Sequence, residues 1–378
     1  MAEKRKAEKR SSVTVEFRET LPYRIASLLR LVAEVPNFEG FDQQIYTTHA
    51  SLPERLRRDI ELIYPKLAEP LLLTRLRDES PGFDDFASLI GWLTQIPPGE
   101  IRKSIALSIE ELDGAETSCA EAADSNLEVP PLDDASGLRA FLQAVPDPWA
   151  ERVREDPEVL EQMLRFLQDP EELKARLVLM LTRFWDGYGR SLDDACTPII
   201  SRSLRYHRQR EYRGDGSDVY HEVTGKRPSS NETRLKFDKA KHVIFVPSCH
   251  SGPYASIACP NGDESTLIVV FNCRSSSGGA GSEPAIVGRV FPPLKGLADE
   301  TRLQIVHLLR DRELYAQQIV DQLDLSQSTV SRHLSLLVAC GVLTVRKGNG
   351  MKFYTINESS MERFIGDLQA LMRKGGSD

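Results

Sequence analysis

The sequence predicts an α+β protein: a mainly helical N-terminal region that carries a small antiparallel sheet, followed by a C-terminal domain of helices and a β-hairpin. Apolar residues recur at helical spacing over most of the chain before residue 206. Three short apolar runs between residues 242 and 271 favour strands instead. With 378 residues, the chain is long enough for two or three packed units.

The composition is that of an ordinary globular protein. Hydrophobic residues make up 40% of the chain and charged residues 28%, which argues against collagen-like, disordered and membrane-spanning classes. The first residues are charged and lack the apolar core of a signal peptide, and no apolar run approaches the roughly 18 residues that span a bilayer. We therefore expect a cytoplasmic protein without membrane contacts, whose 6 cysteines are reduced.

Charge is unevenly distributed along the chain. The net charge is −8, yet the part from Phe291 onward carries 11 Lys and Arg against 10 Asp and Glu. The C-terminal part therefore has a net charge near +1, and the rest of the chain has a net charge near −9. An acidic body with a less acidic C-terminal part is typical of a protein that contacts DNA locally.

Four segments follow from these patterns. Residues 1–12 are predicted to be a disordered basic tail, with a DNA-touching arm as the alternative. Residues 13–273 form a mainly helical sensor or interaction region, with antiparallel strands near 242–271. Residues 274–284 are rich in Ser and Gly and form a flexible linker, and residues 285–378 form the C-terminal domain.

The C-terminal domain begins with three predicted helices. The first covers residues 293–309, the second covers 316–323, and Ser326 is a suitable N-cap for the third. The spacing in the first helix predicts that four apolar side chains face one core: Leu297, Leu303, Val306 and Leu309.

The third helix has two different faces. Val330, Leu334 and Leu337 fall together on a helical wheel and are expected to face inward. The opposite face is small, polar and basic, which allows close approach to the major groove and bidentate pairing of Arg with guanine. The residues expected to contact DNA from this helix are Gln327, Ser328, Ser331, Arg332, Ser335 and, at its flank, His333.

A hairpin follows the third helix. Two strand-like runs between residues 341 and 356 are joined by Lys-Gly-Asn-Gly, a turn sequence with positive charge at its tip. Arg346, Lys347 and Lys352 are expected to neutralise phosphates, which supplies salt-sensitive affinity without base information. The order of helix, turn, helix and hairpin predicts a winged helix-turn-helix that binds double-stranded DNA.

The order and the sequences of these elements resemble those of the ArsR-type winged-helix regulators. Three stretches carry the resemblance, namely Leu-Ala-Asp-Glu-Thr-Arg-Leu, Leu-Ser-Gln-Ser-Thr-Val-Ser-Arg-His-Leu and Gly-Asn-Gly-Met-Lys-Phe-Tyr. The likeness covers about a quarter of the chain. It implies a homodimer that binds a roughly palindromic operator, with dimer contacts from the first helix and from the last, Met361 to Met372.

The resemblance also implies where a metal would bind. Some members of the family place two cysteines at the positions that match Tyr315 and Gln317, and because neither is a thiolate, a soft-metal site of that kind cannot form. Other members use His and carboxylate ligands after the wing, but residues 358–378 contain no histidine. We therefore expect no cofactor in this domain, and we expect any small-molecule or protein effector to act on the N-terminal region.

Three cysteines each end a predicted strand. In an antiparallel meander, Cys249 and Cys273 lie at one end of the sheet and Cys259 lies at the other, roughly 20 Å away. A four-ligand metal site that also uses His250 is therefore not expected. Three interpretations stay open: buried structural thiols, a redox pair of Cys249 and Cys273, or metal binding.

These observations predict an ArsR-like transcriptional regulator, taken to be a repressor, whose N-terminal region modulates operator binding. The alternative is an enzyme or a scaffold module with an appended DNA-binding domain. The sequence contains no phosphate-binding Gly-rich loop, His-Glu-x-x-His pattern or nucleophile elbow, so we expect no enzyme. Aromatic residues of the helical region either fill its core or line an effector pocket; they are Trp92, Trp149, Phe166, Phe184, Trp185 and Tyr188.

Overall fold

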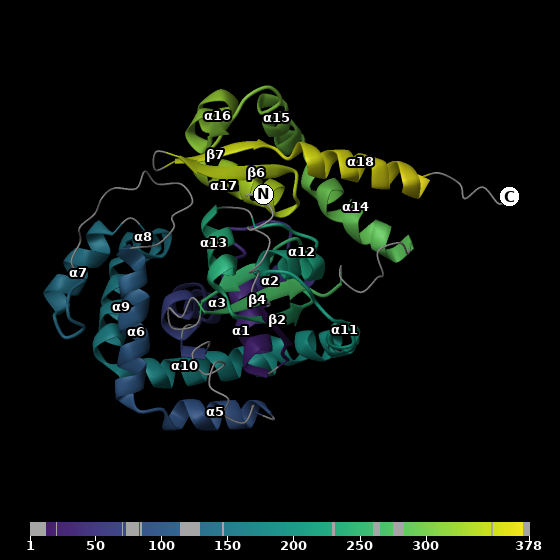
Figure 1. The fold of residues 1–378 in the computed structure, drawn as a ribbon. Helices are drawn as coiled ribbons and strands as arrows, with labels where there is room; N and C mark the ends of the chain where they lie inside the picture. The colour runs from purple at the N-terminus through teal and green to yellow at the C-terminus, as the bar shows by residue number, and fades with distance from the viewer. Residues whose placement is uncertain are drawn as a thin grey trace, which may run out of the picture. The chain divides into compact units, whose positions relative to one another are not determined.

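The computed structural model describes residues 13–19, 21–69, 71–72, 83, 85–113, 129–145, 147–228, 231–259, 265–274, 283–348 and 351–372 (Figure 1). The predicted basic tail and most of the predicted linker lie outside these residues. The chain divides into two compact units. Unit 1 contains Met1–Arg18, Asn37–Asp42 and Cys196–Asp378, and unit 2 contains Glu19–Pro36 and Gln43–Ala195. The predicted boundary at 274–284 therefore falls inside one compact unit.

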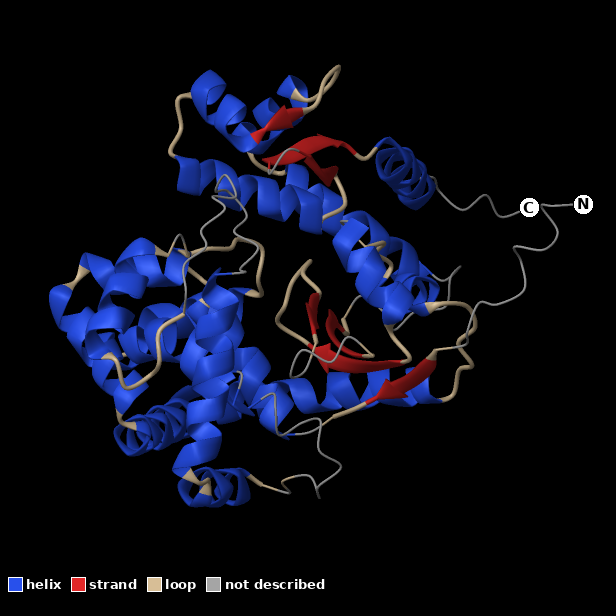
Figure 2. Ribbon diagram, turned by 60° about the vertical axis from the view of Figure 1, so that its left-hand side comes forward, coloured by secondary structure: helices blue, strands red, loops and turns tan. Residues whose placement is uncertain are grey.

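Within its described residues, the regular secondary structure of unit 2 consists of helices joined by loops (Figure 2). Its elements are α1 (Leu21–Ala33), α2 (Gln43–Ser51), α3 (Glu54–Ile63), the π-helix η2 (Tyr64–Ala68), α5 (Phe86–Gln95), α6 (Pro98–Asp113), α7 (Ala135–Ala144), α8 (Pro148–Glu155), α9 (Pro157–Gln168), α10 (Pro170–Phe184), the π-helix η3 (Trp185–Gly189) and the start of α11 (Arg190–Arg208).

Three consecutive helices of unit 2 start with the same pair of residues. Asp147, Asp156 and Asp169 are the N-caps of α8, α9 and α10, and each is followed by a proline in the first turn. Each aspartate side chain accepts hydrogen bonds from two backbone N–H groups. Aspartate satisfies free donors at a helix start, and proline loses nothing there because its missing N–H would have no partner. These pairs fix where each helix begins.

The aromatic residues of unit 2 are mostly core. Trp149, Phe166, Phe184 and Trp185 are buried. The indole of Trp149 donates to the carbonyl of Leu62 at 2.6 Å, so its polar atom is also satisfied inside the protein. These four residues therefore pack the helices of this unit.

The first part of unit 1 is a four-stranded mixed sheet. Its strands are β1 (Thr14–Phe17), β2 (His242–Ser248), β3 (Ser256–Ala258) and β4 (Thr266–Asn272), in the order β1-β2-β4-β3. Strands β1, β2 and β4 are parallel neighbours, and β3 pairs antiparallel with β4. The helices α11, α12 (Gly216–Thr224) and α13 (Asn231–Lys239) bury apolar side chains against this sheet.

The predicted α+β class is confirmed, but the antiparallel order of the sheet is wrong. Only the β3–β4 pair is antiparallel. Strand β2 is buried along nearly its whole length, as is typical of a strand inside a parallel sheet covered by helices. Strand β3 has only three half-buried residues and lies at the edge. The longer strand β4 therefore takes the central place beside β2.

The C-terminal part of unit 1 has the elements of a winged helix. They are α14 (Glu283–Leu297), α15 (Glu300–Leu308), β5 (Leu314–Tyr315), α16 (Ala316–Leu323), α17 (Gln327–Ala339), β6 (Leu343–Gly348), β7 (Met351–Ile356) and α18 (Glu358–Met372). The strands form a small antiparallel sheet in the order β5-β7-β6. No helix in the described part of the chain has the length and apolar character needed to cross a membrane.

The single helix predicted over residues 293–309 is two helices in the structure. The chain breaks before Asp299, whose side chain accepts from the backbone N–H of Arg302 at 3.0 Å and caps α15. The break changes the helical phase, and Leu303, predicted to face the core, is 52% exposed. Leu309 is buried as predicted.

Candidate nucleic-acid interface

Two helices joined by a tight turn present the candidate interface. Helix α16 ends at Asp324, which takes the left-handed conformation with φ 53°. Asp tolerates this conformation better than most residues, so the chain can reverse within a short turn. The hydroxyl of Ser326 then accepts from the N–H of Thr329 at 3.2 Å and caps α17, as the sequence predicted.

The inward face of α17 anchors the helix. Val330, Leu334 and Leu337 are buried, as predicted, in a core that also contains Ile305 and Tyr354. Burying three such side chains contributes several kcal/mol, at roughly 1.5–3 kcal/mol each. The helix is therefore held firmly enough to present its other face in a fixed orientation.

The outward face of α17 is polar and sterically small. Gln327 and Ser328 are exposed, and Ser331, Arg332 and Ser335 are half-buried. The Nε atom of Arg332 is buried and has no hydrogen-bond partner among the described residues. The outer nitrogens of a guanidinium remain strong donors in such a setting. This face can therefore offer donors to base edges without bulky side chains in the way.

His333 does not belong to this face. Its side chain is buried, and Nδ1 lies 3.7 Å from Oε2 of Glu39. Glu39 comes from a segment far away in sequence, Asn37–Asp42, which belongs to the same compact unit. Helical periodicity within α17 cannot predict that a distant segment lies beside His333. The buried side chain of His333 is therefore not available for a DNA contact from this face.

The wing carries a constrained arginine. Arg346 on β6 donates from Nε to Glu313 at 2.8 Å, and its guanidinium lies 4.5 Å from the centre of the Phe353 ring. The ion pair with Arg346 lowers the pKa of Glu313, and the same pair raises the pKa of Arg346. Arg346 is exposed, so it can reach a phosphate only by sharing its charge with this carboxylate.

Two lysines occupy paired register positions near the end of the wing. Lys347 on β6 is in register with Lys352 on β7. Like charges opposite each other destabilise a sheet, and such a pairing is expected where a surface has to attract an anion. The side chain of Lys347 lies outside the described part of the wing.

A row of large apolar side chains is exposed on α14. Val287, Phe291 and Leu294 are 46%, 60% and 47% exposed, and their spacing puts them on one side of the helix. Helix α18, which packs against α14, exposes Ile365 and Met372. We call these five side chains the α14–α18 apolar face. Exposed apolar patches of this kind mark association surfaces.

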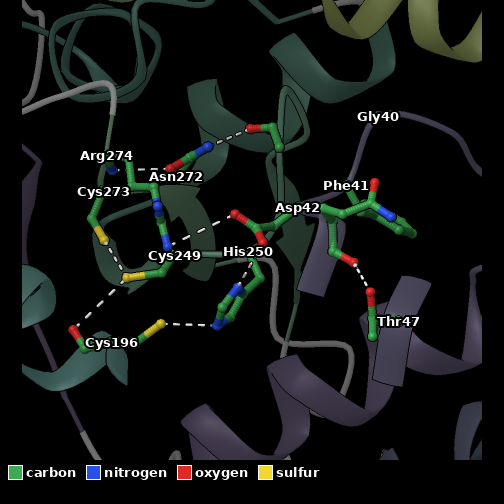
Figure 3. A network of polar contacts seen from close by, with 12 residues as sticks. Gly40, Phe41, Asp42, Thr47, Cys196, Cys249, His250, Asn272, Cys273 and Arg274 are labelled. Carbon is green, nitrogen blue, oxygen red and sulfur yellow. Dashed lines mark hydrogen bonds and ion pairs between the residues drawn. The ribbon is translucent and has the colours of Figure 1, made fainter. Parts of the chain in front are cut away.

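The structure brings the predicted thiol pair together. The sulfur atoms of Cys249 and Cys273 lie 3.4 Å apart, and both residues are buried (Figure 3). The predicted meander would have put a strand between them, whereas the observed order makes β2 and β4 neighbours. Cys259 follows β3, the antiparallel edge strand, at the other end of β4. Cys196 on α11 joins the pair, with its sulfur 2.9 Å from Nε2 of His250.

The positions that match family metal ligands have other roles here. Tyr315 is the N-cap residue of α16, and its backbone N–H donates to the side chain of Gln318 at 3.1 Å. Gln317 donates to Asp321 at 2.9 Å. Among the described residues, no group of three or more His, Cys, Asp or Glu side chains could hold a metal ion.

Comparison with known proteins identifies the same domain. Residues 299–345 match the model of the family described as bacterial regulatory protein, arsR family. The transcriptional activator HlyU of Vibrio cholerae is 38% identical over 78 residues, which are 21% of this chain and 72% of that protein. The arsenical resistance operon repressor of Staphylococcus aureus is 33% identical over 78 residues, 21% of this chain and 75% of that protein.

A third relative shows the same extent of likeness. The HTH-type transcriptional regulator CmtR of Mycobacterium tuberculosis is 35% identical over 74 residues, 20% of this chain and 63% of that protein. In all three comparisons the matched part is about a fifth of this chain. The family model, the winged-helix elements and the polar face of α17 agree on one conclusion. Through its C-terminal domain, the chain belongs to the arsR family of DNA-binding transcriptional regulators.

Proposed function

We propose that this protein regulates transcription by binding an operator as a homodimer, with α17 in the major groove and the β6–β7 wing on the phosphate backbone. The observation that carries the proposal is the small, polar outward face of α17 over an inward face of buried Val and Leu side chains. Sequence would be read by Gln327, Ser328, Ser331, Arg332 and Ser335. The first two lie in the first turn of α17, where recognition helices contact base edges.

The wing would supply the salt-dependent part of the affinity. Arg346, Lys347 and Lys352 are the proposed phosphate contacts. Each phosphate that a lysine or arginine neutralises releases bound counterions and adds about 0.9 to the salt slope. The Glu313 partner of Arg346 reduces that contribution.

The α14–α18 apolar face would form the dimer contact. A second copy of the chain fits it because a two-fold interface brings the same surface of each copy together. The charged pair Arg289–Asp367, at 2.8 Å, bridges α14 and α18 and holds the two helices in one surface. A two-fold dimer predicts an operator with two half-sites in inverted orientation.

The N-terminal region, residues 13–273, would set the affinity of the dimer for its operator. The relatives include a named activator and a named repressor, and repression stays the predicted direction for this chain. The support for control from outside the winged helix is direct contact. Glu39 Oε2 accepts from Arg302 at 3.0 Å, and Lys226 donates to the carbonyl of Ala339 at the C-terminal end of α17.

Operator binding is tested by titrating the full-length protein on labelled duplexes from its own promoter, with fluorescence anisotropy at several salt concentrations. Replacing Arg332→Ala should weaken binding to the preferred duplex about 5- to 150-fold, because a base contact is worth roughly 1–3 kcal/mol. Preference between duplexes should relax while the salt slope changes little. Arg213→Ala removes an arginine that is 88% exposed outside the winged helix and serves as the matched control.

Two results would contradict the proposal. If R332A binds with the parent's affinity and base preference, α17 does not read sequence through this face. If the full-length protein binds every duplex equally at physiological salt, the protein is not a sequence-specific regulator.

A further inference from the structure

A buried thiol cluster occupies one end of the mixed sheet. Cys249 follows β2 and Cys273 follows β4, and the two strands pair in register up to Ser248 and Asn272. The N–H of Cys273 donates to the carbonyl of Ser248 at 2.9 Å, which continues the ladder to the cysteines. Parallel in-register pairing therefore sets the sulfur atoms side by side, 3.4 Å apart.

The cluster extends to a helix and to a histidine. The sulfur of Cys249 lies 3.8 Å from the carbonyl oxygen of Cys196, and the sulfur of Cys196 lies 2.9 Å from Nε2 of His250. His250 is 2% exposed, and its Nδ1 has no hydrogen-bond partner among the described residues. This Nδ1 atom lies 3.8 Å from Oδ1 of Asp42. Figure 3 shows these contacts following one another from Cys273 to His250.

The segment Asn37–Asp42 connects this cluster to the winged helix. At one end, the N–H of Asp42 donates to the carbonyl of His250 at 3.1 Å. In the middle, Lys295 of α14 donates to the carbonyls of Gly40 and Phe41 at 2.9 and 3.4 Å. At the other end, Glu39 accepts from Arg302 at 3.0 Å and lies beside His333 of α17. One short segment therefore touches the residue after Cys249 and the buried side of the recognition helix.

The segment fits tightly at its centre. Gly40 has a φ of 91°, and a Cβ atom there would lie 2.6 Å from a methyl carbon of Leu336 on α17. A Cβ atom on Gly252 would lie 2.0 Å from the carbonyl oxygen of Gly40. Both contacts are closer than van der Waals packing allows for a side chain. The segment therefore packs closely against α17 at Gly40, and we expect a displacement at the His250 end to reach that helix.

We propose that Cys249 and Cys273 are a dithiol that a hydroperoxide oxidises to a disulfide, and that the segment Asn37–Asp42 transmits this change to α17 and lowers operator affinity. The second half rests on the proposed function. A disulfide needs a sulfur–sulfur distance of about 2.05 Å, so the two cysteines close by about 1.3 Å. His250 follows Cys249 directly and moves with it.

The reaction balances with hydrogen peroxide as the oxidant. The sulfur of Cys249 attacks one peroxide oxygen, the O–O bond breaks, and the thiol proton leaves with the other oxygen as water. The resulting sulfenic acid is attacked by the sulfur of Cys273. The S–O bond breaks, the S–S bond forms, and the hydroxyl leaves with the second thiol proton as water. The two thiols lose two electrons, which the peroxide gains.

The cluster sets the speed of this reaction. A hydrogen bond with Cys196 lowers the pKa of Cys249, but the hydrogen bond with Cys273 and burial outweigh it and raise that pKa to about 12. The thiol form therefore dominates at neutral pH, and oxidation is slow because the thiolate is the nucleophile. We therefore expect the disulfide to form during prolonged exposure to oxidant and not during a brief exposure.

The test uses the full-length protein in reduced form and after treatment with hydrogen peroxide. Free thiols are alkylated in denaturant, and peptide mass spectrometry maps the disulfides. Operator affinity is measured by anisotropy before oxidation, after oxidation, and after reduction with dithiothreitol. We expect a Cys249–Cys273 disulfide, a loss of affinity of about tenfold or more, and recovery on reduction.

Four variants make the result specific. Cys249→Ala and Cys273→Ala should bind the operator like the reduced parent and stay unaffected by peroxide. Cys259→Ala, in the same sheet but outside the cluster, should keep the full response. Glu39→Gln should still form the disulfide but lose most of the change in affinity, because its ion pair with Arg302 carries the displacement. Disulfide mapping on the parent decides the thiol chemistry even if one alanine variant fails to fold.

The outcomes separate the two proposals. Absence of the Cys249–Cys273 disulfide overturns the dithiol assignment. Its formation with unchanged operator affinity, or an unchanged response in E39Q, overturns the transmission. If the reduced parent binds no duplex at all, the proposed function fails, and the disulfide map still decides the chemistry of the thiols.

Discussion

The winged helix and the mixed sheet belong to one compact unit but handle polar groups in opposite ways. The winged-helix core is mostly apolar, with Arg302 and His333 as buried polar side chains, and its proposed working residues, such as Gln327 and Arg346, lie at the surface. The sheet buries its reactive groups instead, including Cys249, His250 and His207. Functional residues on the surface of a helix can be found in the sequence, because they recur at helical spacing between the apolar residues that face the core. The contacts of buried reactive residues depend on which strands become neighbours, and strand order cannot be predicted from the local sequence.

The comparison also concerns chemistry. Exposed groups keep near-ordinary properties and act through geometry and charge, whereas burial changes how a group ionises. Burial and the nearby Arg210 lower the pKa of His207 to about 4, and burial raises the pKa of Tyr212 to about 12. The winged helix should therefore respond to substitutions and salt, and the sheet should respond to pH and oxidant.

The largest effect is expected at the α14–α18 apolar face. Phe291→Asp places a carboxylate in the centre of the proposed dimer contact, and burying an unpaired charge costs roughly 3–5 kcal/mol. We expect a monomer at micromolar concentration by light scattering and a loss of operator affinity of about 100-fold or more, since each half-site is then bound singly. Leu235→Asp, at a leucine that is 55% exposed on α13, is the control and should remain dimeric. An F291D protein that stays dimeric would show that the winged helix does not associate through this surface.

An intermediate effect is expected at His207, which stacks on Phe17 with ring centres 4.8 Å apart. Its pKa is about 4 in the folded protein and about 6.5 when unfolded, so the folded state holds the neutral ring. The unfolded chain binds the proton first, and stability is therefore lost as pH falls from about 6.5 to 4. The loss is at most about 3 kcal/mol. His207→Phe should remove most of this loss.

The measurement for His207 must report on unit 1 alone. All 3 tryptophans, Trp92, Trp149 and Trp185, are in unit 2, so tryptophan fluorescence follows the other unit. Hydrogen exchange of peptides from β2, with mass spectrometry at pH 7 and pH 4.5, follows the sheet directly. His307→Gln, at an exposed histidine of the winged helix, is the control. If H207F loses protection on acidification as the parent does, another group governs the acid response of the sheet.

The smallest effect is expected at the wing. Glu313→Gln removes the carboxylate that holds Arg346, which leaves the guanidinium more available for a phosphate. Operator affinity should rise about two- to fivefold, and the salt slope should become steeper by up to about 0.9. Glu211→Gln makes the same charge change at an exposed site outside the winged helix. If E313Q and E211Q change operator affinity equally, the effect comes from the change in net charge and not from the release of Arg346.

Much of the winged helix could be predicted from the sequence. Ser326 as the cap of α17, the inward side chains Val330, Leu334 and Leu337, and the strands of the wing are where the pattern put them. These features depend on residues close together in the chain. The break before Asp299 was missed because a good N-cap residue within an apolar pattern marks a start that periodicity alone does not show.

The rest depended on distant residues. His333 was predicted at the flank of the DNA-contacting face. Its burial involves Glu39, which lies nearly three hundred residues earlier in the chain. The place of β4 beside β2 depends on β1 and on helices α11 to α13, which pack against one face of those strands. The available sequence signal was the apolar run of β2, which is continuous rather than alternating. The thiol pair was one of three open interpretations because its separation depended on that strand order.

The parallel pairing of β1 with β2 has a consequence for synthesis of the chain. Thr14 pairs with His242, more than two hundred residues later. At roughly 5–20 residues per second on the ribosome, β1 waits on the order of ten seconds or longer for its partner. All of unit 2 emerges in that interval, and its short-range helical contacts let it fold first. Until β2 is synthesised, the nascent chain contains a folded helical unit and an unpaired strand, and chaperones can bind that strand.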